Sequence, residues 1–564
     1  MSKKIKAIII IIVALLVCGA IGGAIFIKLA PSFKQRSVGD EFKELGKDEA
    51  MIVLNGRYID ERAKLINGTI YISTELANSQ INNRIFWDKY DNVMCLATND
   101  GLIKVSAGDM SYTIGESTTE VEQQIIYEDG NKAYVLLDFV KKFSVANVDV
   151  RKNPNRVIIE SDFNTQKSFV KTTEDVRLRV GPGKKYDYLL ELASGTELIV
   201  DDDTPAENEH TKVMTNDGIS GYLPNKSLGK ITAKTYVTDK KEEVFEQKSL
   251  GEDVCLAWHN MGVQATEKML AEGTAYVSGA NVLSPTFYTI KGDKGELISR
   301  ADKKYVDAAH AKGFKVWAVV NDIEKDLSRM KTLTRTSSRT KLINNIMAEV
   351  KAYGYDGINI DFEGITKDSA PGFLEFLREL VLVGHKSNLI ISVDNYPAMD
   401  YNKHYNYAEQ GKVVDYVIVM AYDEHTSAEG VAGPVSSISY VRESQKKALE
   451  NVPKERVVMA LPFYSRLWKV KGKKASPSTY GMSGAESAIR ANSATPKWDK
   501  KTEMYFAEFK SEGTKYEIWL EEETSLEKKL DVVKSGNVAG VAFWKLGFER
   551  AATWNMIRRW SDSK

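Results

Sequence analysis

Short apolar runs alternate with longer amphipathic runs from residue 250 to the C-terminus. Apolar residues in segments such as 337–354 and 370–384 recur at helical spacing. The runs between such segments are predicted to be strands: 254–258, 281–288, 315–321, 357–363, 389–395, 416–422, 456–463 and 540–546. Eight βα units in about 310 residues match the count of an α/β fold of the (β/α)8 TIM-barrel type. An open doubly wound sheet is disfavoured, because no glycine-rich phosphate-binding turn follows the first predicted strand.

The fourth predicted strand ends in polar residues, at the end where TIM barrels carry catalytic groups. Side chains alternate in direction along GYDGINIDFEG, so Asn359, Asp361 and Glu363 share the face that points into the barrel mouth. Two carboxylates two positions apart are about 6–7 Å apart, and burying both is costly unless their charges are used. A structural ion pair would explain a single acid, whereas this row of three indicates a catalytic site.

Two other predicted strands end in groups that suit a sugar. The sixth ends in Tyr422 and Asp423, a donor and an acceptor, and the eighth ends in Trp544, whose flat ring can lie against the C–H face of a pyranose. Together with Asn359 of the fourth predicted strand, we group Asp423 and Trp544 as substrate-binding residues. Asp356 is out of phase with the catalytic face and receives a supporting role.

The charge and residue counts exclude several classes of function. The 77 basic and 77 acidic residues cancel, which argues against a nucleic-acid partner. The six His residues show no His-x-x-x-His spacing, and the three Cys residues offer neither a disulfide scaffold nor a metal site. We therefore expect neither a metal nor another cofactor.

The barrel motifs resemble those of family 18 glycoside hydrolases, the chitinase-like fold. DGINIDFE resembles the family signature, and MAYD, LPFY at 461–464, Trp544 and the segment 498–530 resemble further family motifs. Asn359, together with MAYDEH, is most similar to the bacterial spore-germination and cortex-lytic N-acetylglucosaminidases, which act on peptidoglycan. Many chitinases carry Asp at this position, and an Asn cannot share a proton with Asp361 as an Asp could.

This resemblance implies a substrate-assisted, retaining mechanism, which is an exception to the usual scheme of two carboxylates. It makes Glu363 the general acid and then the base, with the substrate's 2-acetamido oxygen as nucleophile. Asp361 would accept the acetamido N–H, and Tyr422 would donate to the acetamido oxygen. Asp423 would bind sugar hydroxyls or tune Tyr422, and Trp544 would form the floor of the site.

The N-terminus carries a run of 21 uncharged residues, 7–27, which follows Lys3, Lys4 and Lys6. Such a helix would be about 31 Å long, close to the thickness of a bilayer core. We expect residues 1–30 to hold a cytoplasmic tip and a transmembrane signal-anchor, which places a single-pass protein in the cell membrane with its bulk on the extracellular, cell-wall side. A cleaved signal peptide and a lipoprotein modified at Cys18 are the alternatives.

Two β-rich modules are expected between a charged stalk, 31–49, and the barrel domain, 250–564. Residues 50–165 resemble the copper-amine-oxidase N-terminal-like domain, although they show no metal constellation. Residues 166–235 resemble a bacterial SH3 domain, with a Gly-Pro-Gly turn at 181–183. This module would contact the cell wall or serve as a spacer.

Together these features predict a membrane-anchored extracellular glycosidase that cleaves β-1,4 bonds after N-acetylglucosamine. Its partner would be peptidoglycan or another N-acetylglucosamine-containing glycan such as chitin, because both polymers offer the same N-acetyl group. The alternative functions are a catalytically silent glycan-binding protein and an envelope scaffold of the same fold.

Overall fold

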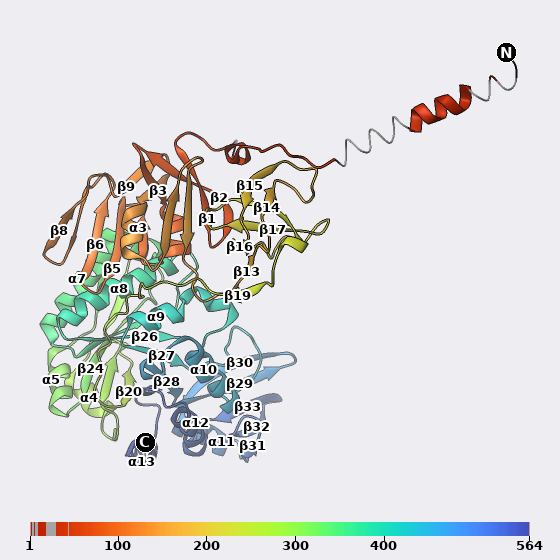
Figure 1. Cartoon of the computed structure of the whole chain (residues 1–564). Coiled ribbons are helices and arrows are strands. Elements are labelled where there is room, and N and C mark those ends of the chain that lie inside the picture. The colour runs from red at the N-terminus through yellow and green to blue at the C-terminus, as the bar shows by residue number, and fades with distance from the viewer. Residues whose placement is uncertain (1, 3–4, 6–8, 19–29, 43, 563–564) are drawn as a thin grey trace. The chain divides into compact units, whose positions relative to one another are not determined.

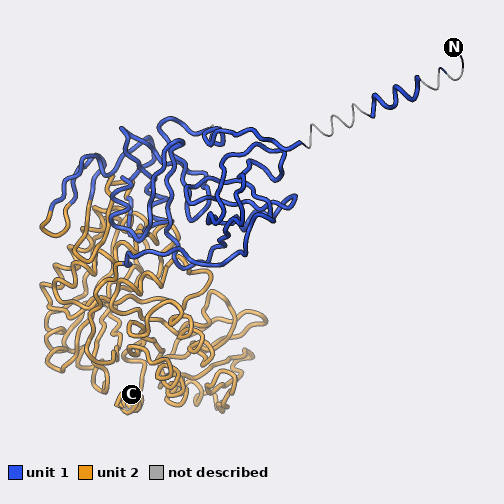
Figure 2. The backbone as a smooth tube through the Cα atoms, viewed as in Figure 1, with its two compact units in different colours: residues 1–87, 105–112, 118–242 blue, residues 88–104, 113–117, 243–564 orange. Residues whose placement is uncertain are grey.

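A computed structural model describes residues 2, 5, 9–18, 30–42 and 44–562. The chain forms two compact units, which are coloured separately in Figure 2. Unit 1 comprises Met1–Trp87, Val105–Tyr112 and Thr118–Glu242, and unit 2 comprises Asp88–Lys104, Thr113–Ser117 and Glu243–Lys564. Each unit is described by itself below.

Unit 2 contains a closed barrel of parallel strands (Figure 1). Pairing of β20 with β34 and of β21 with β24 closes the ring, and all other neighbours around it are parallel too. The predicted TIM barrel and its eight strand positions are thus confirmed. The barrel strands are β20 (Val254–His259), β21 (Val282–Pro285), β24 (Lys315–Asn321), β25 (Gly357–Asp361), β26 (Ile390–Asn395), β27 (Tyr416–Met420), β28 (Val457–Pro462) and β34 (Gly540–Trp544).

Alternation along the strands divides the apolar core of the barrel into two layers. Trp258 and Trp317 belong to a buried cluster inside the barrel, whereas Ile358 and Ile360 belong to the cluster shared with the surrounding helices. At Gly540 a side chain could not fit, because a Cβ would lie 2.1 Å from the carbonyl oxygen of Val254 on the neighbouring strand. The helices are α4 (Glu267–Gly273), α5 (Lys303–Ala311), α6 (Arg329–Thr334), α7 (Thr336–Tyr353), α8 (Ala370–Lys386), α9 (Tyr407–Val413), α10 (Ile438–Asn451), α12 (Glu523–Ser535) and α13 (Ala551–Asp562).

A hairpin extends the barrel sheet, and a separate antiparallel sheet follows β28 in the chain. β22 (Tyr288–Lys291) pairs with both β24 and β23 (Glu296–Ser299). Between β28 and β34 the chain forms a separate five-stranded sheet, packed on α11 (Met482–Ala491), with its own apolar cluster. Its strands are β29 (Tyr464–Lys471), β30 (Lys474–Gly481), β31 (Lys497–Asp499), β32 (Met504–Ser511) and β33 (Thr514–Leu520).

Segment 88–104 belongs to unit 2 although it lies more than 140 residues before the barrel in sequence. It includes β5 (Val93–Thr98). Its Asp88 and Asp91 accept hydrogen bonds from the first backbone N–H groups of α7, those of Thr336 at 2.5 Å and Ser337 at 2.6 Å. Carboxylates at a helix N-terminus satisfy unpaired N–H groups and complement the helix dipole. The residue before α7, Arg335, supplies no side-chain cap of its own.

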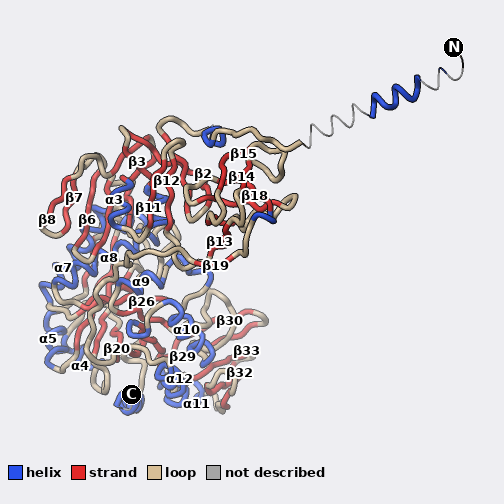
Figure 3. Tube along the Cα trace, in the orientation of Figure 1, coloured by secondary structure: helices blue, strands red, loops and turns tan. Residues whose placement is uncertain are grey.

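Unit 1 holds two seven-stranded sheets (Figure 3), which confirms the expectation of β-rich structure before the barrel. A buried cluster that includes Val53, Phe169 and Tyr236 lies between them. In sheet order, the first consists of β11 (Asn147–Arg151), β12 (Arg156–Glu160), β1 (Glu49–Leu54), β2 (Arg57–Ile66), β3 (Thr69–Ser73), β10 (Lys132–Leu136) and β9 (Ile126–Asp129). The second consists of β15 (Tyr188–Leu192), β14 (Val176–Arg179), β18 (Ser220–Pro224), β17 (His210–Thr215), β16 (Glu197–Val200), β13 (Lys167–Lys171) and β19 (Thr232–Lys234).

The predicted membrane anchor is wrong for the part of the chain that the structure describes. Among those residues, no helix combines the length and the hydropathy needed to cross a bilayer. This finding contradicts the expected single-pass location in the cell membrane. Residues 7–8 and 19–27 of the proposed span lie outside the described residues.

Candidate active site

The C-terminal end of β25 carries the two predicted acids. Asp361 is the last residue of the strand, and its backbone is paired with Asn321 of β24. Glu363 follows two residues later, and its side chain is exposed, whereas Asn359, two residues before Asp361, is fully buried. The row of three therefore runs from the barrel interior to the surface.

A buried aspartate, Asp322, fixes the backbone of the turn that carries Glu363. Its Oδ1 accepts the N–H of Glu363 at 2.9 Å, and its Oδ2 accepts the N–H of Gly364 at 3.0 Å. Arg329 forms an ion pair with Asp322 and also donates to the backbone oxygen of Asp322. A Cβ at residue 364 would lie 2.2 Å from the Arg329 guanidinium, so a larger residue there would displace this guanidinium.

The surroundings of Glu363 favour its protonated form. Loss of water around the carboxyl raises its pKa, and the negative charges of Asp322 and Asp423 raise it further. Tyr396 donates a hydrogen bond to Glu363 Oε2, which opposes this rise. A raised pKa suits a general acid at neutral pH, and the exposed carboxyl can reach a ligand in the barrel mouth.

Asp361 lies in a more strongly perturbed environment. Burial raises its pKa well above the usual value, and Asp394, Glu363 and Asp322 raise it further through their charges. Its Oδ1 atom is buried and has no hydrogen-bond partner among the described residues.

Asn359 is buried inside the barrel, and its hydrogen bonds go to other protein groups. Its Oδ1 accepts from Trp258 Nε1 at 3.0 Å and from Ser284 Oγ at 3.2 Å. Its Nδ2 donates to Ser392 Oγ at 3.0 Å and to Asp394 Oδ1 at 2.8 Å. The structure thus separates Asn359 from the exposed part of the site, where we had grouped it with the substrate-binding residues.

The ends of β27 and β34 contribute the remaining predicted residues. Burial raises the pKa of Tyr422 well above its usual value, so its hydroxyl stays a donor. Asp423 has a left-handed backbone, with φ of 61°, and forms an ion pair with Arg466 at 2.7 Å while accepting from Tyr464 Oη. Trp544 is half-buried, with its ring centroid 5.8 Å from that of Trp258.

Asp356 lies at the opposite end of β25 from Glu363. It accepts hydrogen bonds from Val316 N at 2.9 Å, His310 Nε2 at 2.8 Å and Lys315 Nζ at 3.0 Å. Burial opposes ionisation, but these donors prevail and lower the pKa of Asp356. Its contacts join β25 to β24 and α5, away from the barrel mouth.

Several residues of the site are absent from the predicted set: Asp322, Arg329, Asp394, Tyr396, Tyr464 and Arg466. Asp322 follows the third predicted strand directly, and Asp394 is the penultimate residue of the fifth. The rule that catalytic groups lie at the C-terminal ends of barrel strands could therefore have identified both Asp322 and Asp394.

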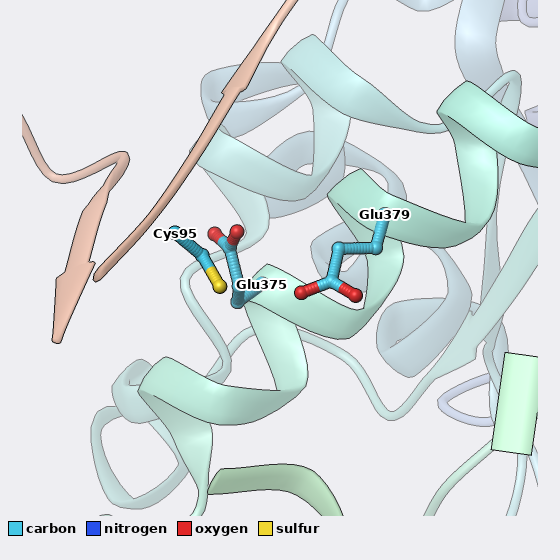
Figure 4. Close-up of side chains that lie close together, drawn as sticks. All are labelled: Cys95, Glu375 and Glu379. Atoms are coloured by element: carbon cyan, nitrogen blue, oxygen red, sulfur yellow. The ribbon is translucent and has the colours of Figure 1, made fainter. Parts of the chain in front are cut away.

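One acidic cluster outside the barrel mouth has the composition of a metal site. Cys95 of β5 lies beside Glu375 and Glu379 of α8, with one candidate ligand atom of each within 4.8 Å of the others (Figure 4). However, the Arg339 guanidinium lies 2.7 Å from Glu379 Oε1 and donates to Cys95 Sγ at 3.5 Å. Burial raises the pKa of Cys95 far above its usual value, so the thiol stays protonated. With Arg378 paired to Glu375, this is a buried ion-pair network in which arginines hold the cationic positions.

A model of the family described as glycosyl hydrolases family 18 matches residues 257–549, which is more than half of the chain. The protein belongs to glycosyl hydrolases family 18. The matched range includes all the catalytic and substrate-binding residues predicted from sequence. The predicted activity class, a glycosidase, is therefore confirmed.

This family 18 chain is similar to two curated proteins of Bacillus subtilis (strain 168). It is 28% identical over 301 residues to the uncharacterized glycosylase YvbX, over 51% of this chain and 86% of that protein. It is 27% identical over 229 residues to the cortical fragment-lytic enzyme, over 39% of this chain and 53% of the relative. The matched segment thus spans about half the length of the cortical fragment-lytic enzyme.

Solved structures share the family 18 fold. The Bacillus cereus spore cortex-lytic enzyme SleL matches with a TM-score of 0.50 and 20% identity, over 57% of this chain and 78% of that chain. A chitinase from Chromobacterium violaceum ATCC 12472 matches with a TM-score of 0.50 and 20% identity, over 55% of this chain and 99% of that chain. At this level of identity the matches concern the fold alone.

Proposed function

We propose that this family 18 glycosidase hydrolyses the β-1,4 bond after N-acetylglucosamine in peptidoglycan. The observation that carries the proposal is the exposed Glu363 carboxyl, which has a raised pKa and is held at the barrel mouth by a turn that Asp322 fixes. The name of the similar cortical fragment-lytic enzyme supports peptidoglycan over chitin as the polymer.

In the proposed reaction, Glu363 protonates the glycosidic oxygen while the substrate's own acetamido oxygen attacks the anomeric carbon. Asp361 accepts the acetamido N–H and stabilises the positive charge that develops on the resulting ring. Tyr422 donates its hydroxyl proton in a hydrogen bond to the acetamido oxygen, and Trp544 packs against the sugar. Glu363, now ionised, then removes a proton from the water that opens the ring, so the anomeric configuration is retained.

Asp423 fits a positioning role in this scheme. Its contacts with Arg466 and Tyr464 occupy one carboxylate oxygen, Oδ1. Its negative charge also raises the pKa of Glu363. We propose that it orients sugar hydroxyls through its remaining oxygen.

The two sheets of unit 1 support a proposal for the domains before the barrel. The second sheet has its own buried core, which includes Val170, Leu178 and Leu223. We assign residues 166–235 to an SH3-like module that contacts the cell wall and residues 50–165 to a copper-amine-oxidase N-terminal-like module.

The test uses the full chain with purified peptidoglycan and, separately, chitin oligomers. Mass spectrometry should find products that end in N-acetylglucosamine from peptidoglycan, and NMR should show retention of configuration. Glu363→Gln should lower kcat by about 10²–10⁴-fold, the usual contribution of a general acid. Glu450→Gln, on the exposed surface of α10, is the matched control. Binding without turnover by the unaltered chain would instead favour a silent glycan-binding protein, and inversion would exclude the substrate-assisted scheme.

A further inference from the structure

Two carboxyl side chains lie on adjacent strands at the floor of the site. In the parallel pairing of β25 with β26, Asn359 is opposite Ser392 and Ile360 is opposite Val393, so Asp361 and Asp394 are next in register. The hydrogen bonds from Asn359 Nδ2 to both Ser392 and Asp394 show that these side chains share the inner face. Neighbouring strands are about 4.8 Å apart, which brings the two carboxyl groups close together.

The surroundings provide little to balance two negative charges. Asp394 is 3% exposed, and the buried Oδ1 of Asp361 has no hydrogen-bond partner within the described ranges. The groups that face the pair are Glu363 from the end of β25, Asp322 after β24, Tyr396 after β26 and Tyr422 after β27. Arg329, the nearby cation, is already paired with Asp322. Burial raises the pKa values of both Asp361 and Asp394, and the charge of Asp394 raises that of Asp361 further. The hydrogen bond from Asn359 opposes the rise at Asp394, and the charge of Glu363 adds to it.

We propose that Asp361 and Asp394 titrate as one unit that holds a single proton at neutral pH, and that Asp394 is a positioning residue for the reaction. Two adjacent buried carboxyls cannot both ionise at low cost, so they share a proton. Asn359 supplies an amide to Asp394 and no carboxyl of its own. The acidic partner of Asp361 therefore comes from the next strand of the barrel.

This inference rests on the proposed function, in which Asp361 accepts the acetamido N–H. Before substrate binds, the amide of Asn359 stabilises negative charge on Asp394 and leaves the proton on the side of Asp361. When the acetamido N–H approaches, the proton passes from Asp361 to Asp394, and the negative charge passes in the opposite direction. No other proton or charge moves in this step.

Two substitutions at residue 394 should shift the acid limb of the kcat/KM–pH profile in opposite directions. Asp394→Asn resembles the protonated aspartic acid, because its oxygen can accept from Asn359 while its N–H group faces Asp361. It stabilises ionised Asp361, so the limb moves to lower pH. In the singly protonated pair the neutral carboxyl of Asp394 donates to ionised Asp361. Asp394→Ala removes this donor, so buried Asp361 ionises less readily and the limb moves about one unit to higher pH. On the acid side this shift lowers kcat/KM about tenfold, because one pKa unit corresponds to a factor of ten.

Glu450→Gln, on the exposed surface of α10, is the control, because it neutralises a carboxyl group away from the site. Its acid limb should coincide with that of the unaltered chain. Limbs for the two Asp394 variants that both coincide with the unaltered profile, or that shift in the same direction, would overturn the proposal. If Asp394→Ala does not fold, the Asp394→Asn profile decides, and an unshifted limb rejects proton sharing.

A second measurement does not depend on turnover. In the chain labelled with ¹³C at aspartate carboxyls, the Asp361 and Asp394 signals, assigned by substitution, should each show both steps of a coupled titration. In Asp394→Asn, Asp361 should titrate in a single step. Independent single-step titrations in the unaltered chain would reject the inference. If the unaltered chain shows the coupled titration but does not hydrolyse peptidoglycan, only the proposed function is rejected.

Discussion

Replacing Asp322 by Asn tests whether the turn that carries Glu363 is held from β24. The substitution keeps an oxygen that can accept from the Glu363 N–H. It places an NH₂ group where Oδ2 accepts from the Gly364 N–H and pairs with Arg329. One hydrogen bond to a charged group is therefore lost, and an arginine loses its carboxylate.

The expected loss of stability follows from the burial of the two partners. A hydrogen bond to a charged group contributes about 1.5–3 kcal/mol, and breaking a fully buried ion pair costs about 3–5 kcal/mol. The side chain of Asp322 is 1% exposed but that of Arg329 is 26% exposed, so water can partly solvate the released guanidinium. We therefore expect the free energy of unfolding to fall by about 3 kcal/mol, near the lower end of the buried range.

The same change should alter the pH dependence of catalysis. The negative charge of Asp322 raises the pKa of Glu363, so its removal lowers that pKa. A general acid with a lower pKa loses its proton at lower pH, and the alkaline limb of kcat/KM should move to lower pH. The loosened turn should also lower kcat about ten- to hundredfold, because misplacing a reacting group by about 1 Å can cost about 10²-fold.

Calorimetry and the pH dependence of peptidoglycan hydrolysis measure the two effects separately. Asp326→Asn, at an exposed position in the same loop, is the control and should change neither. A Tm and an alkaline limb that both match the unaltered chain would refute the role given to Asp322. A lower Tm with an unshifted alkaline limb would show that Asp322 stabilises the fold but does not set the pKa of Glu363.

Two further predictions concern other contacts. Tyr396→Phe removes the hydrogen bond that lowers the pKa of Glu363, so the alkaline limb of kcat/KM should move to higher pH, opposite to Asp322→Asn. Arg339→Met should lower the free energy of unfolding, measured in urea, by about 3–5 kcal/mol, because it removes one partner of a buried ion pair and leaves the other, Glu379, in place. The double substitution with Glu379→Met should recover part of this loss, and equal stability of Arg339→Met and the unaltered chain would contradict the burial argument.

The sequence was sufficient to predict the barrel and the acids of β25. The barrel follows from eight apolar runs that alternate with amphipathic runs. The two acids follow from periodicity within one run, since Asp361 and Glu363 are two positions apart and take the same face. Asp394 could not be paired with Asp361 in this way, because neighbours on adjacent strands depend on register. The fifth predicted strand does carry an acid one residue before its end, but only the register of β25 against β26 places that acid beside Asp361.

The buried position of Asn359 was also beyond pattern analysis. Alternation places Asn359, Asp361 and Glu363 on one face, but it does not show which of these side chains is buried and which is exposed. The indole of Trp258 donates a hydrogen bond to Asn359, and that contact joins residues 101 positions apart. The link between Asp88 and α7 is longer still, at 248 positions, and no local signal predicts it.

The two aspartates that cap α7 have a consequence for how this enzyme can be inherited. A recombination event that copied only residues 245–564 would transfer every catalytic group, yet it would leave behind Asp88, Asp91 and the β5 strand that covers Arg339. The helix would lose its two carboxylate acceptors, and a buried arginine would face water. A transferred barrel would therefore keep these contacts only if segment 88–104 came with it.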